Sequence, residues 1–508
     1  MRRNSILLPF LIGLVLVCGS VWLLRSLSRQ GNPAPGREQS IVTLHCAAGL
    51  AKPVQRIAEQ YEKETGRRVN LQFAGSGTLL SSLQVSKQGD LFLAADDGYL
   101  KKGRELSLID EVLPVATLTP VIAVKSGNPK GIKGLADLIR DDVRVALADP
   151  ATAAVGEVAR KMLEEAGLWA GVEKAVQTRG VVQPTVSGLA TDVASGPIDA
   201  AIIWSAVADQ FDRVESVALE SGDRFRSRVN LGVLRASKIP TAALHFARYL
   251  SASDRGLGIF KEEGFTSVTG DSWAEVPELT LFSGGVNRVA IEKTIREFEQ
   301  REGVRVTTVY NGCGILVSQM RAGASPDAYL ACDTSYMDDV HSRFRDHQLV
   351  SSTEMVIITA PGNPQKITSL ADLAKPGIRV ATTNPEYSAL GGLTHKMLKA
   401  LSLFDPVIAN VTYGDAPTAD AVVTRVRTAR EDAGIVYRAN TIGLAGALEI
   451  IEIDSPLATA SQPVAVSLTS THPQLMDRLV AALTTDQSGT RYREAGFDFI
   501  PGKEWPKP

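Results

Sequence analysis

The chain has 508 residues, of which 44% are hydrophobic and 22% are charged, and its formal net charge is -2. This composition is typical of a soluble globular protein with about two or three domains, and it excludes a strongly basic surface for nucleic acid. The four cysteines include no Cys-x-x-Cys pair and the six histidines show no zinc-ligand spacing, so neither a disulfide scaffold nor a metal site is predicted.

The first residues predict a membrane anchor. Ile6 to Leu24 carries no charge and follows the two arginines of "MRRNS". At about 1.5 Å rise per residue this segment can cross a bilayer core of ~30 Å. No small-x-small cleavage site follows it, and Val17 precedes Cys18 where a lipoprotein signal normally has a small residue. We therefore expect an uncleaved single-pass anchor that holds the rest of the chain outside the cytoplasmic membrane. A cleaved signal and a lipoprotein are the alternatives.

The rest of the sequence is an internal repeat. "TLHCAAGLAKPVQRIAEQYEKETGRRV", from Thr43, aligns without a gap with "TLFSGGVNRVAIEKTIREFEQREGVRV", from Thr280. Later pairs keep the same order: "GNPKGIKGLADL" with "GNPQKITSLADL", "DAAIIW" with "DAGIVY", and "EEGFTSVTGDSW" with "EAGFDFIPGKEW". We expect an anchor and linker at 1–40, module 1 at 41–275 and module 2 at 276–508.

Short strands alternate with amphipathic helices in each module. In module 1, strands are predicted at 41–48, 67–73 and 90–95. The intervening helices have apolar faces at Val54, Ile57, Ala58 and Tyr61, and at Leu79, Leu80 and Leu83. Further apolar runs at 119–124 and 143–148 begin a second set of elements. The pattern predicts an α/β fold with parallel sheets, in which each module has two lobes and a hinge.

A Gly-x-Gly turn follows the second predicted strand of each module. The stretches are "FAGSGTLLSSLQ" at 73–84 and "YNGCGILVSQMR" at 310–321. Each turn joins the carboxyl end of a strand to the start of a helix, where free backbone N–H groups and the helix dipole favour a small anion. A tight connection without a ligand is the structural alternative for such a turn.

Both modules resemble the periplasmic molybdate-binding proteins of ABC importers, which have the type II solute-binding fold. The resemblance rests on the order of "VTLHCAAGL", "FAGSGTL", "DLFLAADDGYL", "SGNP", "GLADL" and "AIIW" in module 1. That family binds its oxyanion through two loop hydroxyls, backbone N–H groups from both lobes and a tyrosine. In module 1 the resemblance implies a ligand site at Gly49, Ser76, Gly77, Val155, Val186 and Trp204.

The two modules depart from the family's residues in different ways. In module 1, Gly49 replaces the first loop hydroxyl and Trp204 replaces the tyrosine, so Ser76 is the remaining loop hydroxyl. In module 2 the matched positions give a second candidate site at Gly285, Cys313, Gly314 and Tyr437, together with Val286, Leu390 and Ala419. Module 2 keeps the tyrosine and loses both loop hydroxyls. We expect module 1 to be the binder.

Two sets of residues have structural interpretations. Cys46, Cys313 and Cys332 lie at or near predicted strand ends, and we expect small buried apolar residues, with a disulfide or redox pair of Cys313 and Cys332 as the alternative. Trp273 and Trp505 recur at the two module ends and are expected to be packing anchors.

The resemblance implies a membrane-tethered binding protein that delivers molybdate or tungstate to an ABC permease, without a cofactor. Sulfate, phosphate or an organic anion is an alternative ligand. A sensory or scaffold receptor with the same fold is an alternative function. An enzyme is not expected, because the chain has no Gly-x-Ser-x-Gly, P-loop, His-Glu-x-x-His or paired catalytic carboxylates.

Overall fold

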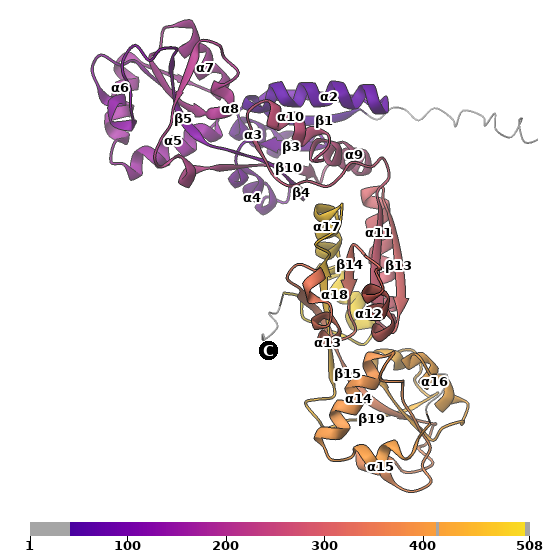
Figure 1. The fold of residues 1–508 in the computed structure, drawn as a ribbon. Coiled ribbons are helices and arrows are strands. Elements are labelled where there is room, and N and C mark those ends of the chain that lie inside the picture. Colours follow the sequence, from indigo (N-terminus) through magenta and orange to yellow (C-terminus); the bar gives the residue numbers. More distant parts are fainter. Residues whose placement is uncertain (1–40, 413–415, 503–508) are drawn as a thin grey trace, which may run out of the picture.

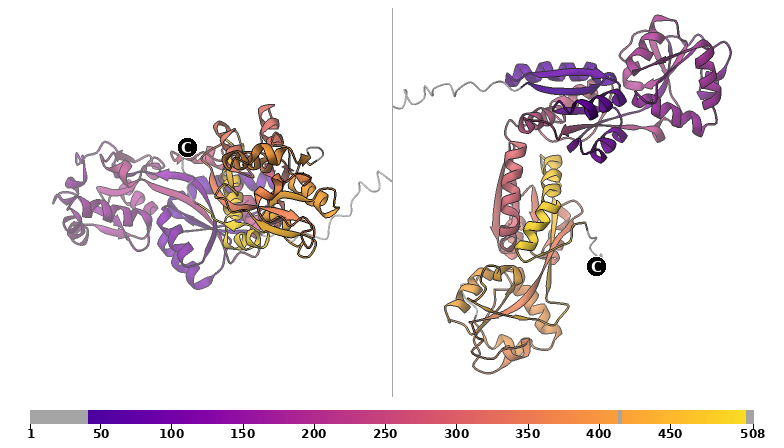
Figure 2. Two further views of the ribbon diagram at one scale, coloured as in Figure 1. Left: turned by 90° about the horizontal axis from the view of Figure 1, so that it is seen from below. Right: turned by 180° about the vertical axis from the view of Figure 1, so that it is seen from behind.

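The computed structural model describes residues 41–412 and 416–502. The two modules form the arms of an L, and each arm consists of an inner lobe near the corner and an outer lobe at its end (Figure 1, Figure 2). The expected anchor at Ile6 to Leu24 and the expected packing role of Trp505 lie outside the described residues. Within the described ranges, no helix is both long enough and apolar enough to cross a membrane.

The inner lobe of module 1 is built on a six-stranded sheet. In spatial order its strands are β11 (Thr266–Ser267), β4 (Ile109–Leu118), β10 (Ser227–Leu234), β3 (Leu91–Ala94), β1 (Val42–Ala47) and β2 (Val69–Ala74). β1 pairs in parallel with β2 and β3, as the alternation of strands and helices predicts. The predicted parallel sheet is a mixed sheet in the structure, because β10 returns from the outer lobe and pairs antiparallel with β3 and β4.

Helices cover this sheet with the apolar faces that the sequence predicts. They are α2 (Ala51–Thr65), α3 (Ser76–Ser86), α4 (Asp97–Glu105), α9 (Pro240–Leu250) and α10 (Gly256–Glu262), and a 3-10 turn, η1 (Ala48–Leu50), follows β1. Ile57 and Tyr61 of α2 and Leu83 of α3 are all buried. α2 is capped at its C-terminus by Gly66, whose φ of 71° lies in the left-handed region that glycine adopts without strain.

The outer lobe of module 1 has a five-stranded sheet. Its strands in order are β7 (Val181–Gln183), β6 (Val145–Ala148), β8 (Ala200–Trp204), β5 (Pro120–Lys125) and β9 (Val214–Val217). The helical elements are η2 (Leu135–Ile139), α5 (Ala154–Glu165), α6 (Trp169–Arg179), α7 (Val186–Ser195), α8 (Ser205–Ala208) and η3 (Gly222–Phe225). β4 ends at Leu118 and β5 begins at Pro120, so the chain passes between the lobes at Thr119.

Module 2 repeats this plan with one continuous sheet. The strands in order are β13 (Arg305–Asn311), β12 (Glu278–Gly284), β14 (Ala328–Leu330), β20 (Thr459–Val466), β15 (Gln348–Thr359), β18 (Ala433–Tyr437), β16 (Val380–Ala381) and β17 (Val411–Thr412), with β19 (Glu449–Glu452) and β21 (Asp498–Phe499) also on β15. β15 runs unbroken through both lobes, where module 1 has the separate strands β4 and β5.

The helices of module 2 follow the same order as those of module 1. They are η4 (Gly285–Asn287), α11 (Arg288–Glu302), α12 (Cys313–Arg321), α13 (Thr334–Asp338), η5 (His341–Arg343), η6 (Leu370–Ala374), α14 (Ala389–Ala400), α15 (Phe404–Ile408), α16 (Ala419–Arg427), η7 (Arg438–Thr441), α17 (Pro473–Leu483) and α18 (Asp486–Glu494).

The two inner lobes are joined through buried charged groups. Glu302 of module 2 is 1% exposed and its carboxylate accepts hydrogen bonds from Arg248 of module 1 (3.2 Å) and from Arg478 (2.6 Å). Asp271 of module 1 accepts the backbone N–H of Gln474 (2.7 Å) and of Leu475 (2.9 Å), in the first turn of α17. Module 1 therefore supplies the cap for a helix of module 2, and the corner of the L is a packed interface.

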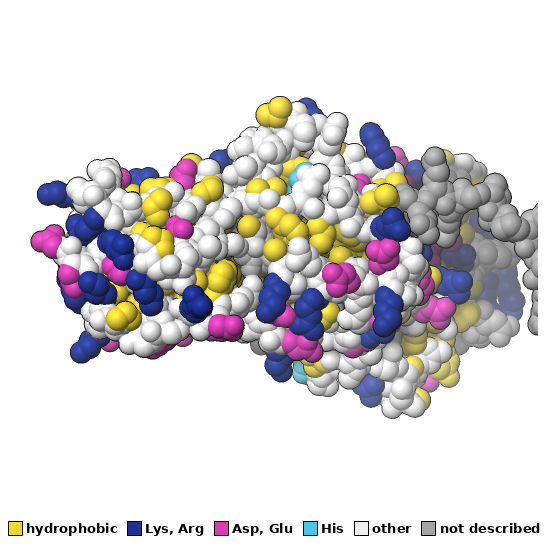
Figure 3. All heavy atoms as spheres, turned by 90° about the horizontal axis from the view of Figure 1, so that it is seen from above, with side chains coloured by type: hydrophobic (Ala, Val, Ile, Leu, Met, Phe, Trp, Pro, Cys, Tyr) yellow, Lys and Arg dark blue, Asp and Glu magenta, His cyan; other side chains and the backbone are white. Residues whose placement is uncertain are grey.

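The surface carries charges of both signs. On the face in Figure 3, Lys and Arg side chains are interspersed with Asp and Glu, and hydrophobic side chains lie between them. This distribution agrees with the net charge of -2.

Candidate functional site

Three helices of module 1 begin at one small cavity between its two lobes. α3 of the inner lobe begins at Ser76, and α5 and α7 of the outer lobe begin at Ala154 and Val186. The cavity has a volume of about 20 Å³ and is lined by Ala47, Ala48, Gly49, Gly75, Ser76, Ala95, Ala153, Ala154, Val155, Thr185, Val186 and Trp204. Five of the six residues predicted for this site line it; Gly77 does not.

Backbone N–H groups from both lobes are available at this place. The amides of Ser76, Val155 and Val186 stand in the first turns of their helices and have no hydrogen-bond acceptor among the described residues. Such amides and the positive ends of the helix dipoles favour an anion. The arrangement therefore favours an anion, which backbone donors would mainly hold.

Ser76 adds a side-chain donor to these amides. Its hydroxyl accepts the backbone N–H of Ala95 at 3.2 Å, and the side chain is 1% exposed. Because this oxygen acts as the acceptor, its own hydrogen remains available to donate.

Gly49 allows the two lobes to approach closely. A Cβ atom at this position would lie 2.7 Å from Val186 Cγ1 and 3.3 Å from Val207 Cγ2. Trp204, the last residue of β8, forms another part of the cavity wall and is 1% exposed. Residues with larger side chains than glycine would therefore occupy the space between the lobes.

Gly77 has a different role in this arrangement from the one predicted. Its N–H donates to the carbonyl of Thr152 in the outer lobe at 2.9 Å. A Cβ atom there would lie 2.2 Å from the carbonyl oxygen of Ala151. Gly77 thus makes a contact between lobes and does not face the cavity.

Sequence reasoning missed two further contributors. Ser187 Oγ donates to the carbonyl of Ala48 across the lobes at 3.3 Å. Thr185 caps α7 by accepting the N–H of Gly188 at 3.2 Å. The capping role of Thr185 could have been predicted from the sequence, because a threonine directly before an apolar helix is a typical N-cap residue.

No charged side chain lines the cavity, so its polarity comes from backbone dipoles and from hydroxyl groups such as that of Ser76. None of its lining residues is ionisable. Asp149, near the outer-lobe loop, accepts the N–H of Ala151 at 2.9 Å and so stabilises the turn that contains Pro150. The site thus offers donors and no carboxylate to accept a proton from a ligand.

Module 2 has a disulfide where module 1 has the Ser76 hydrogen bond. Cys313 begins α12 as Ser76 begins α3, and it is bonded to Cys332, which occupies the place of Ala95 in the repeat. The disulfide alternative is therefore the one that the structure contains. Cys46 is a buried free thiol, as expected, and burial raises its pKa.

A glycine makes room for this bond. A Cβ atom at Gly284 would lie 2.3 Å from Cys332 Sγ, whereas module 1 has Ala47 at the matched position. Cys313 cannot donate a hydrogen bond from sulfur while it is bonded to Cys332.

The other predicted residues of module 2 are packed between its lobes. Val286 packs against the cores of both lobes. Tyr437 is 3% exposed, its hydroxyl has no hydrogen-bond partner among the described residues, and burial raises its pKa. A Cβ atom at Gly314 would lie 2.2 Å from the carbonyl oxygen of Glu386, whereas one at Gly285 would approach nothing closer than 3.9 Å.

Both halves of the chain match one protein family. Residues 42–266 and 279–498 match the model of the bacterial extracellular solute-binding proteins. A putative binding protein of Haemophilus influenzae is 31% identical over 224 residues, covering 44% of this chain and 89% of the relative. The molybdate-binding protein ModA of Mycobacterium bovis is 30% identical over 200 residues, covering 38% of this chain and 74% of the relative.

A similar solved structure is the periplasmic molybdate-binding protein of Azotobacter vinelandii. It has 18% sequence identity and a TM-score of 0.39, and the match covers 44% of this chain and 98% of that one. On the match of the family model to both halves, the chain belongs to the bacterial extracellular solute-binding proteins and carries two tandem copies of that unit.

Proposed function

We propose that module 1 captures a fully ionised tetrahedral oxyanion, molybdate or tungstate, and presents it to the permease of an ABC importer. The observation that carries this proposal is the meeting of three helix N-termini and the Ser76 hydroxyl at one cavity without ionisable side chains. The molybdate-binding relatives support the choice of ligand.

The neutral lining favours a ligand that carries no proton. A protonated phosphate needs an acceptor for its hydrogen, and no carboxylate lines the cavity. Sulfate fits the same chemistry as molybdate and is the runner-up, and a sensory receptor with this fold is the alternative function. Calorimetric titration with molybdate, tungstate, sulfate and phosphate tests the choice, and binding of phosphate alone would contradict it.

The lobes must separate to admit the ligand. A volume of about 20 Å³ holds roughly one water molecule, which is less than a tetrahedral oxyanion occupies. Chain crossings such as Thr119, between β4 and β5, provide the hinge for this movement.

Ser76→Ala is expected to weaken oxyanion binding about ten- to hundredfold. The substitution removes one hydrogen bond to a charged ligand, worth about 1.5–3 kcal/mol. Calorimetric titration measures the change. Ser82→Ala on the exposed side of the same helix is the matched control and should bind as wild type does. Equal affinity in the two variants would remove Ser76 from the site.

We also propose that Ile6 to Leu24 stays attached and tethers both modules outside the cytoplasmic membrane. Its uncharged length and the lack of a cleavage motif support this. Mass spectrometry of the native N-terminus is expected to find the segment intact. A mature chain that starts between Ser26 and Ser40, or an acylated Cys18, would contradict the anchor.

A further inference from the structure

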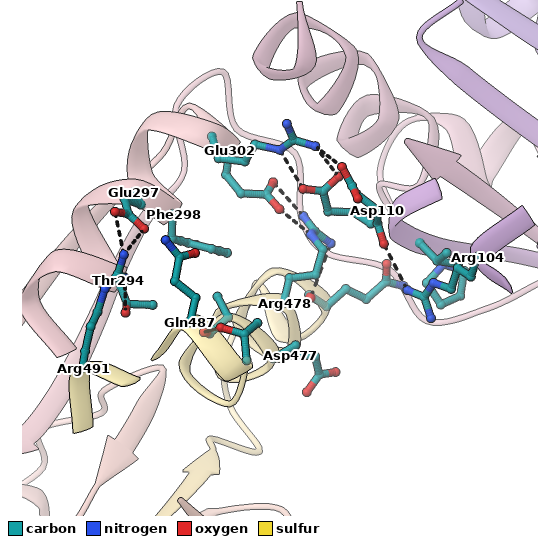
Figure 4. Close-up of a pocket in the computed structure, with 18 residues that line it drawn as sticks. Arg104, Asp110, Thr294, Glu297, Phe298, Glu302, Asp477, Arg478, Gln487 and Arg491 are labelled. Atoms are coloured by element: carbon teal, nitrogen blue, oxygen red, sulfur yellow. Dashed lines mark hydrogen bonds and ion pairs between the residues drawn. The ribbon is translucent and has the colours of Figure 1, made fainter. Parts of the chain in front are cut away.

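A cavity of about 730 Å³ lies at the corner of the L, between the two modules. Charged side chains on its wall are paired with one another, as Figure 4 shows for Arg491 with Glu297 and for Arg478 with Glu302. These pairs satisfy one another within the protein, so this cavity does not point to a charged ligand.

Another cavity, of about 390 Å³, lies between the two lobes of module 2 and is here called the seam cavity. α12 and α13 of the inner lobe and α14 of the outer lobe contribute to its wall. Its volume is within the range of about 300–1,000 Å³ that small-molecule sites typically have. Of the residues predicted for the ligand site of module 2, only Gly314 lines it, so the seam cavity is distinct from that site.

The repeat shows what occupies the same place in module 1. α5 and α14 both have 12 residues and align without a gap, so Glu157 matches Gly392 and Lys161 matches Lys396. The Glu157 carboxylate accepts a hydrogen bond from Lys161 Nζ at 2.8 Å. It also lies beside Tyr99 of α4 in the inner lobe, where burial and then the charge of Glu157 raise the pKa of the phenol. Module 1 therefore holds a carboxylate between a lysine of one lobe and a tyrosine of the other.

Module 2 keeps the lysine and the tyrosine but not the carboxylate. Tyr336 of α13 matches Tyr99 in the ungapped part of the repeat. A Cβ atom at Gly392 would lie 3.1 Å from the Tyr336 hydroxyl oxygen, so the glycine faces the phenol directly. In the part of the chain that the structure describes, the Tyr336 hydroxyl has no hydrogen-bond acceptor and Lys396 has no ion-pair partner. Both groups line the seam cavity and are free to hold a ligand.

The other charges on the wall leave this pair suited to an anionic group. Asp339 is paired with Arg321 at 3.4 Å, and Glu386 is exposed, so water screens its charge. Burial, together with the charges of Asp333 and Asp339, raises the pKa of Tyr336 to about 12, so its hydroxyl stays protonated and can donate. A phenol that donates and an ammonium group are both good partners for a carboxylate.

We propose that the seam cavity binds the carboxylate of a small organic acid, between the Tyr336 hydroxyl of the inner lobe and the Lys396 ammonium of the outer lobe. The acid takes the place that the Glu157 carboxylate has in module 1, and it links the two lobes of module 2. Because Gly392 leaves this place open, the carboxylate comes from a ligand instead of from the chain. The inference concerns module 2 and does not rest on oxyanion capture by module 1.

Calorimetric titration of the full chain with acetate, lactate and succinate tests the site. We expect at least one of these acids to bind, with one molecule per chain. Tyr336→Phe and Lys396→Ala each remove one hydrogen bond to a charged group, so each should weaken binding about tenfold. Lys293→Ala is the matched control, because Lys293 is an exposed lysine of α11 that does not line the cavity, and it should bind as wild type does. No saturable binding of any of the three acids, or equal affinities of Lys396→Ala and Lys293→Ala, would overturn the proposal.

Gly392→Glu supplies the missing carboxylate from the chain itself. Module 1 has Glu157 at the matched position, so the variant should fill the site and remove acid binding. Val289→Glu adds the same charge to module 2 at a side chain that is 78% exposed on α11, and it should leave acid binding in place. Undiminished acid binding in Gly392→Glu would contradict the assignment of the site.

Gly49→Val separates this site from the one in module 1. It crowds the cavity of module 1 and should weaken the binding of molybdate but not of the acids, whereas Gly392→Glu should do the reverse. Acid binding that is lost in Gly49→Val and kept in Gly392→Glu would overturn the proposal, because the acid would then occupy the cavity of module 1. A failure of molybdate to bind leaves the acid titration unchanged, so the two proposals fail separately.

Discussion

Replacing Gly49 with valine, the residue type that module 2 has at Val286, is expected to weaken oxyanion binding by module 1 about a hundredfold. A Cβ atom at this position already lies 2.7 Å from Val186 Cγ1, and the two γ-methyl groups extend further into a cavity of about 20 Å³. Overpacking typically costs about 1–3 kcal/mol, and here it falls on the closed, ligand-holding arrangement. A cost at the upper end of this range corresponds to a loss of affinity of about a hundredfold.

Calorimetric titration measures this loss, and circular dichroism checks that the fold is kept. Gly134→Val is the matched control, because a Cβ atom at Gly134 meets nothing within 4 Å and its φ of -174° is extended backbone that valine adopts. Gly49→Ala should fall between wild type and Gly49→Val. Undiminished binding by Gly49→Val would show that the ligand lies elsewhere.

Removing the carboxylate at the module junction is expected to cause the largest loss of stability. Glu302→Ala leaves Arg248 and Arg478 buried without their common partner. Breaking a buried ion pair on one side costs about 3–5 kcal/mol, because an uncompensated charge remains in the interior. Urea unfolding of the chain from Ser40 measures the loss in free energy of unfolding.

The matched control for this substitution is Glu297→Ala on the same helix. Its carboxylate pairs with Arg491 and is 44% exposed, so the expected loss is below about 1 kcal/mol. Equal losses in the two variants would contradict a special role for Glu302. The same junction is the reason to test the two modules together, because separate expression would expose Glu302 or its arginine partners.

The junction also predicts how stability depends on pH. Burial alone raises the pKa of Glu302, but the charges of and hydrogen bonds from Arg478 and Arg248 outweigh it and hold the pKa below its ordinary value. A group with a lowered folded pKa stabilises the protein above its unfolded pKa, about 4.3 for glutamate, and the stabilisation is lost as the pH falls through the folded value. Wild type should therefore lose stability below about pH 4 more steeply than Glu302→Ala.

Individual strands and helices could be predicted, because the spacing of apolar residues within one short segment indicates each of them. β1 and β3 lie within the predicted strands 41–48 and 90–95, and β2 extends one residue beyond the predicted 67–73. The buried face of α2 was visible in the spacing of its apolar residues. The antiparallel pairing of β10 with β4 could not be predicted, because it joins segments that are far apart in the sequence. It depends on how the chain returns from the outer lobe.

The residues of the candidate site could be predicted to a similar degree. The positions of Ser76, Val155 and Val186 followed from the repeat and from the family resemblance, and the structure places them on one cavity. The contact of Gly77 with Thr152 joins two loops of different lobes, so no local pattern reveals it. The disulfide of Cys313 with Cys332 remained one of two interpretations, because only the geometry shows that Gly284 leaves space for it.

We propose that module 1 binds an oxyanion and that module 2 does not. Calorimetric titration of the chain from Ser40 with molybdate, with sulfate as the competing ligand, tests it most directly. We expect one molybdate per chain, with binding weakened in both Gly49→Val and Ser76→Ala. Two molybdates per chain would contradict it, because both modules would then bind. One molybdate that binds unchanged in both variants would also contradict it and would move the site to module 2.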